Sequence, residues 1–312
     1  MAGILTTNTG VSVGNKPSVL DVVLLQGATV TPFLSMIGRG SVTNILHSWI
    51  TDKVRDARDN AQIEVSTTHN LPQGSKQKTS NVTQIFTNYV QVSFSEQGVS
   101  TYGQSELAHQ LNKCAKEHTL DIERALLGLN NASVFDAYTE RQLNNVASKM
   151  AGVFHYVPDA HRFNKGGAKK VKLTLASLND FLIPVWENNN TLLELNVFCS
   201  ALLKRKVNDI AKDYLVHNNK DKEINYTVTK IYTDFGIVNF IPHRMFNKQN
   251  KLDDVMLAFD KSLISFKTLS KTGATNQTKM PSTETADVYR TYTEGTLEVK
   301  DNFALSSAEG IE

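Results

Sequence analysis

Residues 104–128 constrain the fold more than any other segment, because their apolar residues recur at steps of three and four. This spacing places the apolar side chains on one face of an α-helix. The face consists of Leu107, Leu111, Cys114, Ala115, His118, Ile122, Ala125 and Leu126. About 25 residues at about 1.5 Å each form a rod of about 37 Å, which is long for a globular helix. The stripe therefore predicts a core-packed helix, which Thr101 or Ser105 is expected to cap and Gly128 to end.

Composition limits the class of protein. The chain has 312 residues, a formal net charge of +2 and 21% charged residues, so it can bury a core without a disulfide or metal. Near-neutral charge excludes a strongly basic nucleic-acid binder. Cys114 and Cys199 have no paired spacing, which predicts two buried, reduced thiols. No secretory signal or membrane-length apolar run is visible, so we expect a cytoplasm-like compartment.

Two strands with a long polar connection precede the helix. Residues 42–52 and 85–95 are predicted strands, the second because apolar Val90 and Val92 alternate with polar residues. Between them, residues 60–84 are polar and rich in turn formers, and so long a loop is uncommon inside a compact domain. We expect the two strands to pair as a projecting β-arm. Because an isolated two-stranded ribbon is marginally stable, the arm should need a packing partner.

The remaining segments mix helices and strands without a regular alternation. Residues 1–30 suggest an arm, after which Pro32 starts a short helical turn that Gly38 closes. Residues 130–170 are predicted to be irregular. Helices are expected at 175–186, kinked or started near Pro184, and at 198–214; strands are expected at 224–232, 236–241, 255–259, 263–269 and 292–300, with a hairpin turn at 233–236. This order predicts an α+β fold.

No familiar catalytic motif occurs in the chain. Phosphate loops, dinucleotide-binding glycine motifs, nucleophile elbows and zinc-protease motifs are all missing. His155 and His161 flank Asp159 as a conceivable metal cluster, but a plain loop is the favoured interpretation. The basic stretches at 165–172 and 204–206 could touch phosphates, although solvated surface is favoured. Nothing assembles a nucleophile, a base and an oxyanion donor, so we predict no enzymatic activity, cofactor or metal.

Several short motifs, taken in order, resemble one known family. They are Thr31-Pro32-Phe33 within 31–38, Asn44, His47-Ser48-Trp49, Asp52, 105–111, 121–128, 228–236, 241–244, 269–273 and 294–299. In this order the chain resembles the major capsid proteins of tailed bacteriophages, which have the Hong Kong 97-like (Johnson) fold. It is most similar to the small major head proteins with a Thr-Pro-Phe motif. Two features depart from the family: Asn144-Asn145 replaces a glycine pair, and residues 275–285 are longer and more polar.

The resemblance implies a division of the chain into five parts. These are an N-terminal arm at 1–41, an extended β-arm (E-loop) at 42–97, a peripheral domain at 98–172 with its spine helix at 104–128, an axial domain at about 173–250, and a return to the peripheral domain at 251–312. It also implies that four motif residues act as anchors, namely Thr31, Pro32, Phe33 and Trp49. The β-arm would lie over a neighbouring subunit.

The implied function is structural. The chain would assemble with itself into hexamers and pentamers, forming an icosahedral virion shell around double-stranded DNA in the bacterial cytoplasm. Scaffolding, portal and decoration proteins are possible further partners, and no fused scaffold is expected, because only about 30 residues precede Thr31. The alternatives are an encapsulin-like nanocompartment shell and a cytoplasmic enzyme with an unrecognised site.

Two sets of residues follow from this interpretation. A subunit that serves both kinds of ring needs flexible joints, and the candidate hinges are Gly38, Gly40, Gly98 and Gly103. The candidate DNA-facing residues are Lys113, Lys116 and Arg124 on the long helix, whose contacts should be independent of sequence and sensitive to salt.

Overall fold

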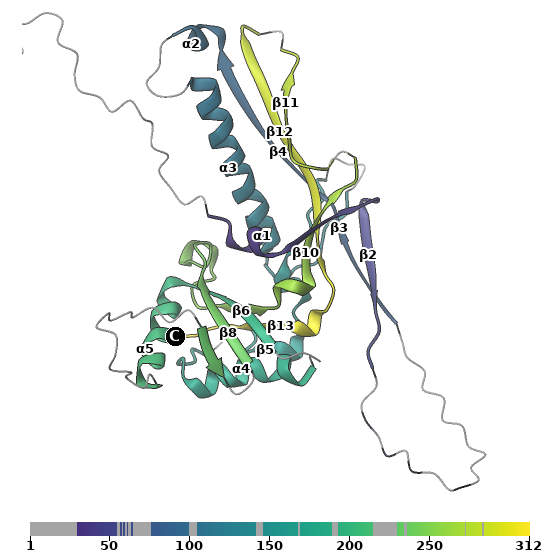
Figure 1. The fold of residues 1–312 in the computed structure, drawn as a ribbon, viewed down its shortest axis with the longest axis vertical. Helices are drawn as coiled ribbons and strands as arrows, with labels where there is room; N and C mark the ends of the chain where they lie inside the picture. The colour runs from purple at the N-terminus through teal and green to yellow at the C-terminus, as the bar shows by residue number, and fades with distance from the viewer. Residues whose placement is uncertain are drawn as a thin grey trace, which may run out of the picture.

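A computed structural model shows an α+β fold with two sheet-containing units and a projecting β-arm (Figure 1). It describes residues 30–54, 57, 59, 61, 64, 76–99, 105–141, 146–167, 169–188, 193–214, 230–233, 236–271, 273–282 and 284–312. The predicted fold class is confirmed.

The long helix, α3, spans Glu106–Leu126. Its buried residues include Cys114, His118 and Ile122, so most of the predicted stripe faces the core. Leu107 and Leu111 are only partly buried, and Ala115, which was placed on the stripe, is exposed. Gly128 follows with a φ of 78°, which glycine adopts without steric cost. Ser105 occupies the N-cap position, but its side chain makes no capping hydrogen bond. Among the described helices, none has both the length and the apolar character needed to cross a membrane.

The first sheet lies beside α3 (Figure 1). It contains β1 (Gly38–Val42), β10 (Ile264–Leu269), β12 (Ala286–Val299), β11 (Asn276–Met280) and β4 (Gln84–Ser93). Strand β12 is the centre, since it pairs antiparallel with β10 and β11 along one edge and with β4 along the other. Strand β1 pairs parallel with β10 at the sheet margin. The sheet therefore gathers segments from the start, middle and end of the chain.

The β-arm is shorter than predicted. Strand β2 (Leu46–Thr51) pairs with β3 (Gln77–Val82), whereas the expected partner segment, 85–95, forms β4 and the following turn and pairs with β12. The predicted pairing was wrong because Phe86 and Val90 make one face of β4 apolar enough to be buried beneath α3. The polar sequence of β3 has no alternation of apolar and polar side chains. Strand β3 can therefore lie in a ribbon that projects into solvent.

The second sheet has the strand order β5-β13-β9-β6-β8-β7. The bounds are β5 Arg162–Phe163, β6 Leu193–Cys199, β7 Lys230–Thr233, β8 Gly236–Pro242, β9 Met256–Phe259 and β13 Leu305–Ala308. Helices α4 (Leu175–Asn188) and α5 (Ala201–Tyr214) pack against it. The hairpin between β7 and β8 is confirmed. The helix predicted from residue 198 begins three residues later, because Phe198 belongs to the buried strand β6.

Short elements complete the chain. They are α1 (Pro32–Met36), α2 (Phe94–Gly98) and the 3-10 turns Val153–Tyr156, Asp159–His161, Lys248–Asn250, Lys261–Leu263 and Asn302–Ala304. The helical turn at Pro32 is confirmed, but Gly38 and Gly40 lie in strand β1 and not in a turn, because their backbone pairs with β10. Residues 224–229 of one predicted strand lie outside the described residues. Both cysteines are buried and free.

Candidate assembly elements

A buried carboxylate fastens the start of the described chain to the long helix. Glu123 on α3 is fully buried. Its Oε1 and Oε2 accept hydrogen bonds from the backbone amides of Phe33 and Leu34, at 2.8 and 2.7 Å. These amides belong to the first turn of α1, where the backbone has no partner within the helix. Glu123 therefore satisfies two donors that would otherwise be buried without acceptors.

His243 completes this anchor from the end of β8. Its Nε2 lies 2.9 Å from Glu123 Oε1, and its Nδ1 lies 3.1 Å from the backbone amide of Met245. Because the Met245 amide can only donate, Nδ1 accepts and the proton is assigned to Nε2, which donates to Glu123. The anchor joins three segments that are distant in sequence.

Phe33 provides the apolar part of the same anchor. Its ring is fully buried and meets Phe198 of β6 and Phe259 of β9 edge-on, with centroids 5.7 and 5.2 Å apart. Pro32 occupies the first turn of α1, where its missing amide costs no hydrogen bond. Two of the predicted anchors, Pro32 and Phe33, thus lie at the point where α1 and α3 meet the second sheet.

Trp49 packs where the β-arm leaves the body. Its ring lies 5.7 Å from that of Tyr156 and 5.6 Å from that of His47, centroid to centroid. Tyr156 donates from its hydroxyl to the carbonyl of Ser80 on the facing strand, at 3.3 Å. Both strands of the arm are therefore held at their base by the 3-10 turn that contains Tyr156.

A second carboxylate ties the arm to the first sheet. Glu298 on β12 is almost completely buried and contacts His47 of β2 and, at 2.5 Å, Nζ of Lys267 on β10. Burial alone would raise the pKa of Glu298, but the hydrogen bonds from Lys267 and His47 outweigh it, so the pKa lies below its usual value. The ionised carboxylate thus bridges three strands.

Acid should weaken this bridge. Because the pKa of Glu298 is lowered from 4.5, its contribution to stability is present above that value and disappears as the pH falls through the lower folded pKa. We expect Glu298→Gln to destabilise the unassembled chain at pH 7, and the difference from wild type to shrink between about pH 5 and pH 3. Urea unfolding at several pH values measures this. Glu140→Gln, at an exposed carboxyl, is the control, and a pH-independent difference for Glu298→Gln would contradict the prediction.

Asn81 joins the arm to the body through its side-chain amide. The residue is fully buried. Nδ2 donates to the carbonyls of Leu297 and Ala151 at 2.9 and 3.2 Å, and Oδ1 accepts from the amide of Ala151 at 3.0 Å. The end of β3 is therefore fixed against β12 and against the irregular segment around Ala151.

Large apolar side chains remain exposed on the projecting elements. In the described part of the chain they are Val30, Ile45, Leu46, Ile50, Val54, Ile85, Tyr89, Phe94, Val99, Val146, Trp186 and Leu202. Several lie on the arm or just after β1, and others lie along β4 and α2. Strands β1 and β11 also stand at sheet margins with mostly exposed residues. Exposed apolar residues and open strand edges are features of surfaces that pair with other chains.

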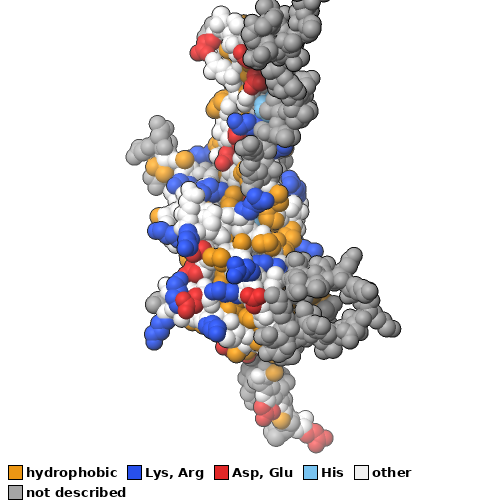
Figure 2. All heavy atoms as spheres, turned by 90° about the vertical axis from the view of Figure 1, so that its left-hand side faces the viewer, with side chains coloured by type: hydrophobic (Ala, Val, Ile, Leu, Met, Phe, Trp, Pro, Cys, Tyr) orange, Lys and Arg blue, Asp and Glu red, His pale blue; other side chains and the backbone are white. Residues whose placement is uncertain are grey.

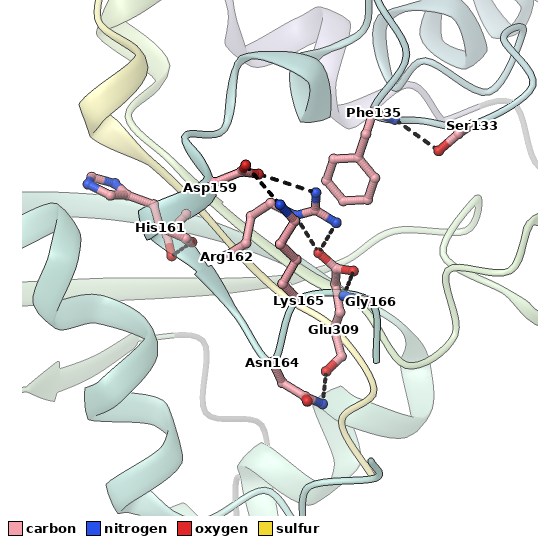
Figure 3. Close-up of polar contacts among 10 residues, drawn as sticks. Ser133, Phe135, Asp159, His161, Arg162, Asn164, Lys165, Gly166 and Glu309 are labelled. Atoms are coloured by element: carbon pink, nitrogen blue, oxygen red, sulfur yellow. Dashed lines mark hydrogen bonds and ion pairs between the residues drawn. The ribbon is translucent and has the colours of Figure 1, made fainter. Parts of the chain in front are cut away.

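The loop with two histidines forms ion pairs instead of a metal cluster. Figure 3 shows Arg162 between Asp159, Glu309 and Phe135. Arg162 Nη2 lies 2.7 Å from Glu309 Oε1, and its guanidinium stacks 3.6 Å from the centre of the Phe135 ring. Lys165 contacts Asp159 at 2.8 Å and, by this hydrogen bond, lowers the pKa of that carboxyl. Arg162 therefore connects the loop before it to the C-terminal segment.

The histidines of this region point to carbonyls. His155 Nδ1 lies 3.0 Å from the carbonyl oxygen of Phe135, and His161 Nδ1 lies 2.9 Å from that of Leu305. Within the described ranges, no group of three or more His, Cys, Asp or Glu side chains is arranged to hold a metal ion.

The other predicted residues are dispersed. Gly98 ends α2, and Gly103 lies outside the described residues. Lys113 forms an ion pair with Glu117 at 3.8 Å on the exposed side of α3. Lys116 is also exposed. Arg124 donates to the Leu129 carbonyl at 3.2 Å. Their hinge and DNA-contacting roles stay predictions.

Sequence reasoning missed the two buried carboxylates. Glu123 and Glu298, together with His243, lie within motifs that carried the family resemblance, but their roles depend on contacts between distant segments. A charged residue flanked by apolar neighbours, as in Asp121–Gly128, was the available signal. It could not indicate that the partners are backbone amides of α1.

Comparisons with known proteins agree with this architecture. A model of the SU10 major capsid protein family matches residues 5–312. The major capsid protein of Escherichia phage Phieco32 is 32% identical over 157 residues, which cover 50% of this chain and 44% of that protein. The aligned region is therefore less than half of that relative.

Solved capsid structures share the fold at low sequence identity. The capsid of cyanophage P-SCSP1u superposes with a TM-score of 0.62 at 9% identity, covering 99% of this chain and 97% of the other. Microbacterium phage Oxtober96 gives 0.60 at 12% identity, covering 96% of each chain. The SrpI encapsulin of Synechococcus elongatus PCC 7942 gives 0.56 at 11% identity, covering 96% of this chain and 92% of the other. The chain belongs to the SU10 major capsid protein family and has the Hong Kong 97-like capsid fold.

Proposed function

We propose that the protein is a structural subunit that assembles with its own copies into hexamers and pentamers, which form the icosahedral head of a tailed phage. The shell encloses double-stranded DNA as part of the virion, and it assembles in the bacterial cytoplasm. Scaffolding, portal and decoration proteins are proposed as further partners. The subunit performs no catalysis in this role.

The projecting β-arm is the observation that carries the proposal. Its base is fixed by Trp49, Asn81 and Glu298, whereas Ile50 and Val54 farther along are 66% and 81% exposed. A firmly rooted ribbon with uncovered apolar residues gains stability when it lies across another copy. Many such contacts, closed by symmetry, make a particle much more stable than any single interface.

We also propose a division of the chain into a peripheral and an axial domain, based on the two sheets. The first sheet with α3 corresponds to the peripheral domain, and the second sheet with α4 and α5 to the axial domain (Figure 1). The axial domain then also includes β5, β9 and β13, from segments that were first expected in the peripheral domain. Gly98 and Gly103 precede α3 in the sequence and remain candidate hinges. Gly38 and Gly40 can act as hinges only if the whole edge strand β1 moves, because their backbone is paired with β10.

An encapsulin-like shell around a protein cargo is the second candidate, because the SrpI encapsulin shares the fold. The family match favours a phage head.

Negative-stain electron microscopy of the protein, expressed alone and with its genomic neighbours, tests the proposal. We expect shells, capsomers or tubes from the wild-type chain. A paired variant, Ile50→Ser with Val54→Ser, should remain folded by circular dichroism and assemble poorly. Val146→Ser, at another exposed apolar residue, is the control. A folded wild-type chain that stays monomeric under every condition would refute the assembly function, and particles filled with protein cargo would favour the nanocompartment.

A further inference from the structure

Two cations, Arg124 and Lys251, and two acids, Asp254 and Glu309, line a concave surface at the C-terminal end of α3. The pocket has a volume of about 530 Å³ and is lined by Arg124 and by residues within 129–135, 166–167, 249–255 and 309–310. It lies where the end of α3 meets loops of the second sheet. Figure 2 shows that Lys and Arg side chains gather across the middle of the face formed by the left-hand side of Figure 1.

The turn between β8 and β9 presents three of the cations. Asn247 accepts from the amide of Asn250 at 3.0 Å and donates to the carbonyl of Arg244 at 2.9 Å. Asn250 donates to the carbonyl of Met245 at 2.9 Å. These side-chain bonds hold the turn in one conformation, while Arg244, Lys248 and Lys251 extend from it into solvent.

Arg124 adds a fourth cation from α3. Its Nη1 lies 3.4 Å from Asn250 Oδ1, and its Nη2 lies 3.2 Å from the Leu129 carbonyl oxygen. These bonds place the guanidinium beside the turn. The remaining N–H donors of the exposed guanidinium are available to another acceptor.

The acids of the pocket wall are already neutralised. Glu309 pairs with Arg162 at 2.7 Å, and Asp254 pairs with Lys170. Within the described residues, Arg124, Arg244, Lys248 and Lys251 take part in no ion pair. The surface therefore carries a local positive charge, although the whole chain has a net charge of only +2.

We propose that Arg124, Arg244, Lys248 and Lys251 form a contact surface for the phosphate backbone of double-stranded DNA, so that this face lines the interior of the shell. The inference rests on the proposed function. Spaced, flexible cations on a fixed turn neutralise phosphates without reading bases, as a shell that encloses any sequence requires. The surface includes one residue of the predicted DNA-facing set, Arg124, and adds three residues to which the sequence analysis gave no contact with DNA.

Salt-dependent binding tests the assignment. The unassembled full-length chain is titrated with a fluorescent 30-base-pair duplex of arbitrary sequence at about 50–200 mM salt. Each lost phosphate contact should reduce the log–log salt slope by about 0.9. Replacing all four cations with Gln should therefore reduce the slope by about three to four. A triple variant that replaces only Arg244, Lys248 and Lys251 keeps the hydrogen bonds of Arg124 and so guards against misfolding. It should reduce the salt slope by about 2.7.

A matched control removes four exposed lysines elsewhere. Lys76, Lys78, Lys261 and Lys300 lie on the arm or at the ends of other strands, and their replacement with Gln should leave the slope within about one unit of wild type. An equal loss in the control would overturn the assignment, as would an unchanged slope in the triple variant. Competition by polyglutamate as strong as by DNA would also overturn it, in favour of an acidic peptide.

Intact particles separate this inference from the proposed function. Closed wild-type shells should leave added duplex unbound, and shells opened by mild treatment should bind it. Binding to the outside of closed shells through the four cations would overturn the interior placement. If the variants assemble into normal shells and bind DNA like wild type, the inference fails while the assembly function stands. Absence of any wild-type assembly would refute the function itself.

Discussion

Replacing Glu123 with Ala is expected to lower the free energy of unfolding of the unassembled chain by about 3–5 kcal/mol. The substitution leaves the amides of Phe33 and Leu34 and the Nε2 of His243 without their acceptor. Each unsatisfied buried donor costs about 1–3 kcal/mol, and the cavity adds to the loss. Denaturant unfolding followed by circular dichroism measures the change.

Glu123→Gln distinguishes the anchor from simple packing. Glutamine keeps the volume and one acceptor oxygen, but its amide nitrogen presents hydrogens to at least one of the three donors. We expect a loss of about 2–3 kcal/mol. Glu117→Gln, at an exposed ion pair on the same helix, should change stability by less than about 1 kcal/mol. Equal effects at the two positions would show that the buried carboxylate anchors nothing.

The anchor also predicts a defect in assembly. Without it, α1 loses its polar attachment to α3 and depends on the burial of Phe33, Leu34 and the adjacent Ile37. The N-terminal segment should then be released more easily, and particles should form in lower yield even at temperatures where the subunit remains folded. Limited proteolysis measures the release directly. Cleavage near residue 30 at the wild-type rate would argue against this role of Glu123.

Local sequence patterns predicted the elements that carry their own periodicity. Helix α3 follows from a stripe of apolar residues at helical spacing, and the second half of β12 falls within the strand predicted at 292–300. Helix α4 was predicted to within two residues of its C-terminal end, with Pro184 inside it. These signals are local, since each element buries one face regardless of which segment covers it.

Pairing between distant segments could not be predicted in the same way. Strand β4 looked like one half of a hairpin, yet it joins β12 about 200 residues later, because its apolar face needs the cover of α3. Strand β3 was missed because its polar residues carry no period. Edge strand β11 was missed for the same reason. Sequence alone does not indicate which neighbouring strand forms the backbone hydrogen bonds of a polar strand.

The candidate site shows the same limit at the level of single residues. Phe33 and Trp49 were chosen from a family resemblance, and the structure packs both at junctions between segments. Glu123 lay in the same motifs and was not chosen, because a carboxylate on a helix is most often solvated. Only the folded chain reveals that its two oxygens face backbone amides.

Gly152→Ala is expected to be among the most destabilising single-atom additions in the chain, with a loss of at least about 3 kcal/mol. A Cβ at this position would lie 2.2 Å from the amide nitrogen and 2.3 Å from the Cα of Gly128, and 2.7 Å from the carbonyl carbon of Leu127. All three atoms are backbone atoms of the turn that ends α3, so no side chain can rotate away. Relief requires the end of α3 to move from the core that surrounds Leu127.

The effect should arise from this close approach and not from a general intolerance of alanine. Gly98 ends α2, and a Cβ built there has no atom within 4 Å, so Gly98→Ala should be neutral or stabilising by up to about 1 kcal/mol. Thermal unfolding of the two variants beside wild type makes the comparison. Because the end of α3 also carries Glu123 and Arg124, Gly152→Ala should disturb both the anchor of α1 and the cationic surface. A variant at Gly152 with wild-type stability would mean that the turn at Gly128 and the segment at Gly152 do not touch.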